Sequence, residues 1–188
     1  MTDAGIGHNG GPDIGPGVAW RKHCWARARA DLLPHLPIEV LRGRVRRAQE
    51  LGLDYKTYAS VRASTGHDVI GFLFSSNALR LLAPKPVLAK DRAAKLSAIM
   101  RCGRIALVQR PLVPVDVERI MGGLLDSVHP APLALASWAE ARGAVRAALG
   151  KVAADGVILV GDMALERDWC EAGRLAGYVP ADRSFAQA

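Results

Sequence analysis

The sequence lacks the features that mark several special classes of protein. Only 5% of its 188 residues are aromatic, and no apolar run approaches the about 18 residues that a membrane-spanning helix needs. Hydrophobic residues make up 50% and charged residues 23%, which is ordinary globular usage. A transmembrane protein, a disordered tail, a collagen and a coiled coil are therefore excluded, and the length suits one domain with a short appendage.

Cysteine is also scarce, and the three cysteines lie far apart. Cys24, Cys102 and Cys170 are separated by 78 and 68 residues, and no C-x-x-C pair is present. That number and spacing argue against a disulfide framework and a structural zinc site. The first four residues lack the basic and apolar regions of an export signal. We expect a cytoplasmic protein, and no cofactor is indicated.

Several catalytic motifs are missing as well. The chain has no G-x-S-x-G, no Walker A sequence and no H-E-x-x-H, which lowers the expectation of a familiar hydrolase, nucleotide triphosphatase or zinc protease.

Charge is distributed unevenly along the chain. The net charge is +7, and 19 of the 25 basic residues are arginine. Residues 20–66 contain ten bases and four acids, and residues 80–110 contain eight bases and one acid. Residues 111–188 contain seven bases and ten acids. A basic body with an acidic end can attract a polyanion, such as a nucleic acid, on one face.

We divide the chain into three parts. Residues 1–18 contain six glycines and two prolines, a composition expected to be mobile in isolation. Residues 5–12, GIGHNGGP, resemble a short N-terminal segment of uncharacterised bacterial and phage-related proteins, and the resemblance implies no activity. Residues 19–66 form a basic helical part, and residues 67–188 form a small α/β core.

The basic part is predicted to hold three helices. Residues 19–33 carry an apolar stripe and, beside it, Arg21, Trp25 and Arg29, which could stack on bases or simply pack and remain solvated. A second helix is expected over 37–51. Asp54 is a good N-cap for a third helix that ends near Ser64. A hairpin over residues 58–74 is the alternative.

Residues 44–63 resemble the general pattern of a helix-turn-helix. The pattern requires a small residue, a turn glycine four positions later and spaced apolar residues in the second helix, and Ala48, Gly52, Tyr55, Tyr58 and Val61 occupy these positions. In this interpretation arginines contact phosphates, while Lys56, Thr57 and Ser60 face outward to read bases. The full set of predicted contact residues is Arg42, Arg44, Arg46, Arg47, Lys56, Thr57, Ser60 and Arg62.

After residue 67 the pattern changes to buried strands separated by helices. Continuous apolar runs at 69–74, 105–108 and 157–160 are typical of strands covered on both faces. Helices are expected over 90–100, 115–126, 137–150 and 163–176. We predict a mixed α/β fold with a small, largely parallel, three-stranded sheet. Ser76 or Asn77 is expected to cap a short helix over 78–82.

The leading hypothesis is a nucleic-acid-binding or regulatory protein without catalysis. The first alternative is a small α/β enzyme in which Asp162 and Glu166, after the last predicted strand, bind Mg²⁺ or act as acid and base. The simpler interpretation of those two residues is that Asp162 caps the next helix. The second alternative is an adaptor that docks a protein partner through its basic helices.

Overall fold

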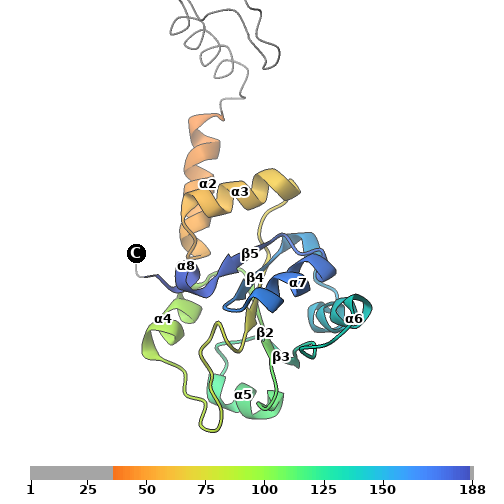
Figure 1. The fold of residues 1–188 in the computed structure, drawn as a ribbon. Coiled ribbons are helices and arrows are strands. Elements are labelled where there is room, and N and C mark those ends of the chain that lie inside the picture. The colour runs from red at the N-terminus through yellow and green to blue at the C-terminus, as the bar shows by residue number, and fades with distance from the viewer. Residues whose placement is uncertain (1–35, 187–188) are drawn as a thin grey trace, which may run out of the picture. The chain divides into compact units, whose positions relative to one another are not determined.

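The computed structural model describes residues 36–186, so the predictions for residues 1–18 and for the helix over 19–33 fall outside the described residues. Packing separates a unit of residues 1–41 from a unit of residues 42–188. Helix α2 (Ile38–Glu50) begins in the first unit and continues into the second. The second unit holds every strand and the remaining helices of the described residues (Figure 1).

A five-stranded, all-parallel sheet forms the centre of this unit. Its strands lie in the order β3-β2-β1-β4-β5. Their bounds are β1 (Gly71–Ser75), β2 (Gly103–Val108), β3 (Ser127–Pro130), β4 (Val157–Gly161) and β5 (Gly177–Pro180). The α/β prediction is confirmed, with a Rossmann-like alternation of strands and helices, but the prediction of three strands is wrong.

The two strands that the sequence did not predict are those at the edges of the sheet. Strands β3 and β5 are four residues long, and both end in proline. An edge strand has one neighbour instead of two, and most residues of β3 and β5 are only half-buried. The long apolar run by which a central strand is recognised is therefore absent from both.

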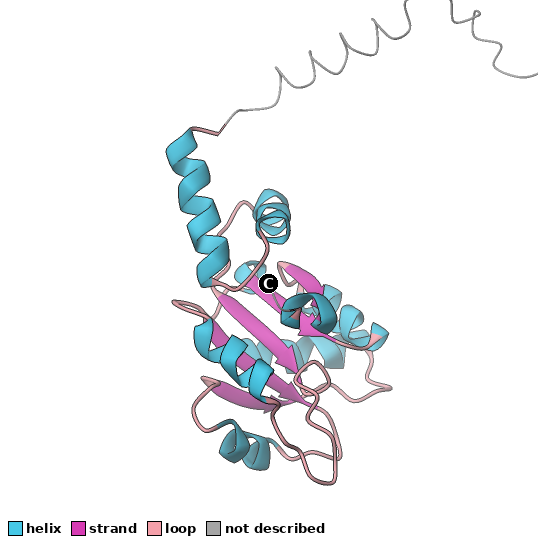
Figure 2. Cartoon of the chain, turned by 90° about the vertical axis from the view of Figure 1, so that its left-hand side faces the viewer, coloured by secondary structure: helices cyan, strands magenta, loops and turns pink. Residues whose placement is uncertain are grey.

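Helices precede the first strand, connect consecutive strands and follow the last one, and they cover both faces of the sheet (Figure 2). Besides α2, they are α3 (Tyr55–Thr65), α4 (Lys90–Ala98), α5 (Pro114–Met121), α6 (Trp138–Leu149), α7 (Ala164–Gly173) and α8 (Ala181–Phe185). A capping box starts α6, because Ser137 and Glu140 each accept a backbone hydrogen bond from the other. Helices α5 and α7 end several residues earlier than the sequence predicts.

Two hydrophobic clusters, one on each face, hold these layers together. On one face, strand residues such as Phe72 and Phe74 pack with residues of α2, α3, α4, α5 and α8. On the other face, Leu73 and Leu107 pack with Val145 of α6 and residues of α7. The alternation of strand side chains between two apolar layers explains why each of the three central strands contains a continuous apolar run.

Helices α2 and α3 form the predicted helix pair, so the hairpin alternative for residues 58–74 is wrong. Asp54 caps α3 by accepting a hydrogen bond from the backbone N–H of Thr57 at 2.9 Å. Gly52 has a φ of +64° in the turn, which favours glycine. Its carbonyl accepts a hydrogen bond from Lys95 Nζ of α4 at 2.6 Å, so the turn is attached to the sheet-covering layer.

Two local predictions near the strand ends need correction. Residues 76–80 form a turn and no helix follows over 78–82, and the side chain of Ser75, not of Ser76 or Asn77, accepts the hydrogen bond from Ala78 N–H. Asp162 does not cap α7, because the helix begins one residue later, with Met163 at the N-cap position.

Candidate functional site

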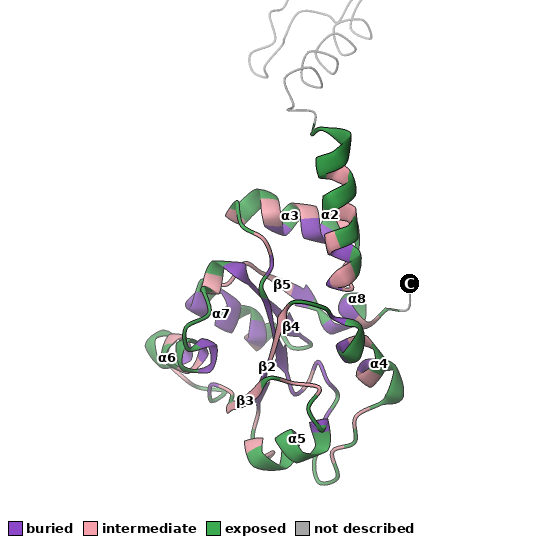
Figure 3. Cartoon of the chain, turned by 180° about the vertical axis from the view of Figure 1, so that it is seen from behind, coloured by how far each residue is buried: buried purple, intermediate pink, exposed green. Residues whose placement is uncertain are grey.

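The basic helix pair packs into the same core as the sheet. Ala48, Tyr58 and Val61 are buried in the cluster that includes the strand residues, and Figure 3 shows this burial at the C-terminal end of α2 and along one side of α3. On α2, Arg42 and Arg46 are exposed and four residues apart, and Arg44 is half-buried. Two of the predicted phosphate contacts, Arg42 and Arg46, therefore lie exposed at the surface of this helix.

Arg47 has a different environment from its neighbours. Its guanidinium group donates to Asp68 Oδ2 at 2.9 Å and to Glu50 Oε2 at 3.2 Å. It also donates to three backbone carbonyl oxygens, of Val69, Met100 and Arg101. Because all its donor groups are directed into the protein, Arg47 connects α2 to the start of β1 and is not placed to contact a phosphate.

Asp68 is the acidic centre of this arrangement, which we call the Arg47 cluster (Arg47, Glu50, Tyr58 and Asp68). The Tyr58 hydroxyl donates to Asp68 Oδ1 at 2.9 Å. Burial alone would raise the pKa of Asp68, but the hydrogen bonds from Tyr58 and Arg47 outweigh burial and hold the pKa below its ordinary value. Arg62, another predicted contact, lies 3.9 Å from Asp68 Oδ1.

On α3 the predicted base-reading residues are not equivalent. Thr57 is buried, and its hydroxyl donates to Asp54 Oδ2 at 2.5 Å, so the expectation that it faces outward is wrong. Lys56 and Ser60 are exposed. They face a hollow bounded by strand β5 and by Arg183 of α8, a residue that no sequence pattern had indicated.

A second group of polar residues meets at the carboxyl edge of the sheet. Glu166, in the first turn of α7, is fully buried. Its Oε2 accepts from the backbone N–H groups of Asp162 and Met163 at 2.6 and 3.1 Å. Its Oε1 accepts from the side-chain amides of Asn77 and Gln109 at 3.0 and 3.2 Å. This Glu166 cluster joins the ends of β1, β2 and β4.

Gly161 makes room for this cluster. A Cβ atom at that position would lie 2.6 Å from Glu166 Oε2 and 2.6 Å from the ring of Tyr178, closer than atoms in contact can approach. With four donors around its two oxygens, Glu166 has no open position for a metal ion. No group of three or more His, Cys, Asp or Glu residues that could hold a metal occurs among residues 36–186.

Asp162 differs from Glu166 although the two are close in sequence. Its side chain is exposed, and no ion pair or side-chain hydrogen bond holds its carboxylate within the described range. It directly follows β4, while Asn77 lies just after β1, and these adjacent strands lead to opposite halves of the sheet. Ligands of open α/β sheets bind at such a switch point, outside the carboxyl ends of the strands.

A hollow at this edge of the sheet has few polar groups. It measures about 160 Å³, and Gln109, Arg110 and Met163 are part of its wall. Arg110 is exposed and follows β2. One guanidinium group and one amide therefore face an otherwise apolar wall, an arrangement that suits a small ligand with one anionic group.

The described thiols do not suit nucleophilic chemistry. Burial raises the pKa of Cys102 to about 12 and that of Cys170 to about 11. Both thiols stay protonated near neutral pH, whereas a nucleophilic cysteine requires the thiolate. Neither residue belongs to the Glu166 cluster.

Comparisons of the chain with protein-family models, curated proteins and solved structures give no match. No helix in the described part of the chain is both long and apolar enough to cross a membrane.

Proposed function

We propose that the protein is a cytoplasmic, nucleic-acid-binding or regulatory protein of bacterial or phage-related type, and that helix α2 contacts the phosphate backbone. The observation that carries the proposal is the arginine-rich surface of α2, on which Arg42 and Arg46 are exposed and Arg44 is half-buried. Arginine pairs with phosphate oxygens through its planar fork of N–H groups. Arg44 and Arg46 have no ion-pair partner within residues 36–186.

This surface fits backbone contacts better than base reading. Thr57 is engaged by Asp54, and Lys56 and Ser60 face a hollow of the protein. Phosphate contacts position a protein on nucleic acid but carry no sequence information. We therefore expect binding with little sequence preference.

The double variant Arg44→Ala/Arg46→Ala is expected to weaken binding to nucleic acid. The slope of log K against log salt concentration should become less steep, as expected for the loss of about two phosphate contacts. The measurement is fluorescence anisotropy with random duplex DNA, single-stranded DNA and RNA at about 50–300 mM salt. Arg119→Ala is the matched control, because Arg119 is an exposed arginine of α5 that pairs only with Asp116 in the described structure.

An unchanged affinity and salt slope in the double variant would contradict the proposal. Absence of binding by the wild-type protein even at low salt would also contradict it. A protein partner for the basic helices would then be the alternative to pursue.

The switch point supports a second candidate function, a small-molecule site or enzyme active site at Asp162. The free carboxylate of Asp162 is the group available for acid–base chemistry there, since Glu166 is fully engaged. Protein-observed NMR screening of small acidic fragments is expected to shift the amides of Asn77, Arg110 and Met163. Asp162→Asn should alter the affinity of these fragments, and the control Asp155→Asn, at an exposed acid beyond the sheet's other end, should not. Fragments that bind only elsewhere would eliminate this candidate.

A further inference from the structure

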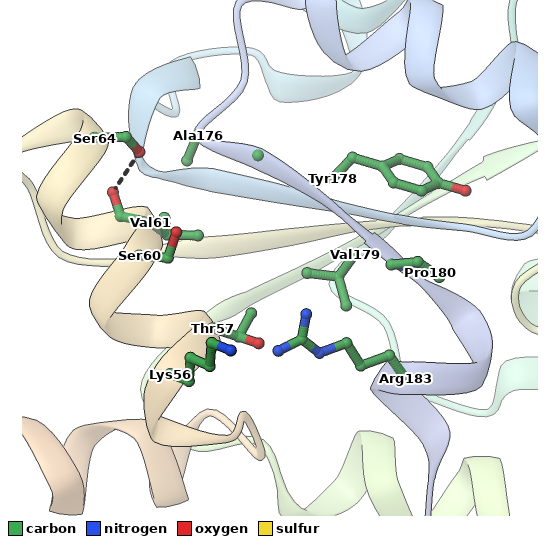
Figure 4. Close-up of a pocket in the computed structure, with 11 residues that line it drawn as sticks. Lys56, Thr57, Ser60, Val61, Ser64, Ala176, Tyr178, Val179, Pro180 and Arg183 are labelled. Carbon is green, nitrogen blue, oxygen red and sulfur yellow. Dashed lines mark hydrogen bonds between the residues drawn. The ribbon is translucent and has the colours of Figure 1, made fainter. Parts of the chain in front are cut away.

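A hollow of about 270 Å³ lies between α3, β5 and α8, and it is distinct from the carboxyl-edge cluster (Figure 4). We call it the α3–α8 hollow, and it is defined here by Lys56, Ser60, Val179 and Arg183. Its volume is several times the approximately 30 Å³ that a water molecule occupies in the liquid. It has room for a small polyatomic ion and accompanying water.

Two cationic side chains from different elements enter this hollow. Lys56 comes from the first turn of α3 and Arg183 from α8, and Figure 4 shows their nitrogen atoms directed toward one another. Arg183 Nη2 lies 3.3 Å from Asp54 Oδ2, and both side chains of this ion pair are about half exposed. Lys56 has no ion-pair partner in the described structure. The three charges leave a net positive charge, which an anion placed between the two cations would neutralise.

Hydrogen-bond donors of other kinds border the same space. The Ser60 hydroxyl is exposed and lies one helical turn after Lys56. Along β5, the N–H of Ala176 donates to the carbonyl oxygen of Val157 at 2.9 Å. Because peptide groups alternate in direction along a strand, the N–H of Val179 is directed to the open edge of the sheet, where the hollow lies. The Thr57 hydroxyl is excluded as a donor, since it donates to Asp54.

We propose that the α3–α8 hollow binds a phosphoryl group, with Lys56 and Arg183 as counter-charges and Ser60 and the Val179 amide as hydrogen-bond donors. Donors arriving from α3, β5 and α8 suit a tetrahedral group better than a planar carboxylate. Arginine provides a planar fork of N–H donors and lysine provides a point charge, and both are common in phosphate sites. The phosphoryl group could belong to a nucleic-acid backbone or to a phosphorylated small molecule. The proposal stands without the nucleic-acid function.

The test uses inorganic pyrophosphate as the probe and the full chain as the protein. Titration followed by NMR is expected to shift the amides of Ser60, Val179 and Arg183 with saturation. Lys56→Gln should weaken pyrophosphate binding about fivefold or more, because a charge-assisted contact is lost. Folding should be unaffected, since Lys56 is exposed and lies near the positive end of α3. Lys151→Gln is the matched control, because Lys151 is an exposed lysine outside the hollow.

Absence of saturable shifts at about 10 mM pyrophosphate, above the millimolar range of weak binding, would overturn the proposal. Equal affinities of the wild-type protein and Lys56→Gln would also overturn it. A competition experiment distinguishes the two sources of the phosphoryl group. In it, a single-stranded oligonucleotide is added to the protein with bound pyrophosphate. Displacement of pyrophosphate supports a backbone phosphate in the hollow. Pyrophosphate binding that the oligonucleotide does not affect supports a phosphorylated small molecule, even if the proposed nucleic-acid function fails.

Discussion

Replacing Glu166 by alanine is expected to lower the free energy of unfolding by about 3–5 kcal/mol, because buried donors would lose their acceptor. The backbone N–H groups of Asp162 and Met163 cannot turn away from the space that the carboxylate fills. The amides of Asn77 and Gln109 would lose a shared acceptor as well. For a chain of this length the expected fall in Tm is about 6–20 °C.

The variant Glu166→Gln refines this prediction. A glutamine retains one oxygen for the two backbone N–H groups, and the side-chain amides of Asn77 and Gln109 can rotate to present their own oxygens. We therefore expect Glu166→Gln to cost clearly less than Glu166→Ala. Thermal and urea unfolding of both variants measure the difference.

Glu171→Ala is the matched control, since Glu171 is an exposed acid on the same helix and should change stability by less than about 0.5 kcal/mol. A loss below about 1 kcal/mol in Glu166→Ala would show that the Glu166 cluster is not a stabilising connection between the strand ends. Glu166 would then be available for a chemical role beside Asp162.

Arg47→Ala is expected to give the second largest loss, about 2–4 kcal/mol at neutral pH. The variant removes five hydrogen bonds and leaves the Asp68 carboxylate without its closest arginine partner. We expect a smaller loss of stability than for a fully buried ion pair, because the Asp68 side chain is 38% exposed and water screens part of its attraction to Arg47. The neighbouring exposed variant Arg46→Ala should change stability by less than about 0.5 kcal/mol.

The cost of Arg47→Ala should also depend on pH. The pKa of Asp68 is lowered in the folded protein, so the carboxylate contributes stability that is fully present above its unfolded pKa of about 3.9. This stability is lost as the pH falls through the folded pKa. The difference between wild-type protein and Arg47→Ala should therefore narrow from pH 7 toward about pH 2–3. Urea unfolding at several pH values measures it, and a constant difference would contradict the assigned role of Asp68.

Arg46 and Arg47 show how far a basic sequence can predict a binding surface. The two residues are adjacent and chemically identical, and the sequence assigns both to phosphate contact. Their directions on α2 differ by about 100°, so Arg46 faces solvent and Arg47 faces the Arg47 cluster. The residue that accepts the Arg47 guanidinium, Asp68, is 21 positions away, and no local pattern could pair them.

The carboxyl edge of the sheet shows the same limit of prediction from sequence. Asp162 and Glu166 were recognisable because they follow a buried strand, but their sequence spacing suggested a shared task. The contribution of Asn77 and Gln109 could not be predicted, since they lie 89 and 57 residues away from Glu166. Once the strand order is known, residues that directly follow parallel strands are expected to meet.

The sequence by itself determined the α/β class, the three central strands and the helix α3 with its Asp54 cap, because these depend on local periodicity, on capping residues and on burial along one segment. It also determined the α2–α3 turn, through Gly52 and Asp54. The tertiary structure alone decided the number of strands, since edge strands are half-buried and lack the apolar signal. It also decided which charged residues are free, because ion pairs such as Arg47–Asp68 and Arg183–Asp54 form between segments that only folding brings together.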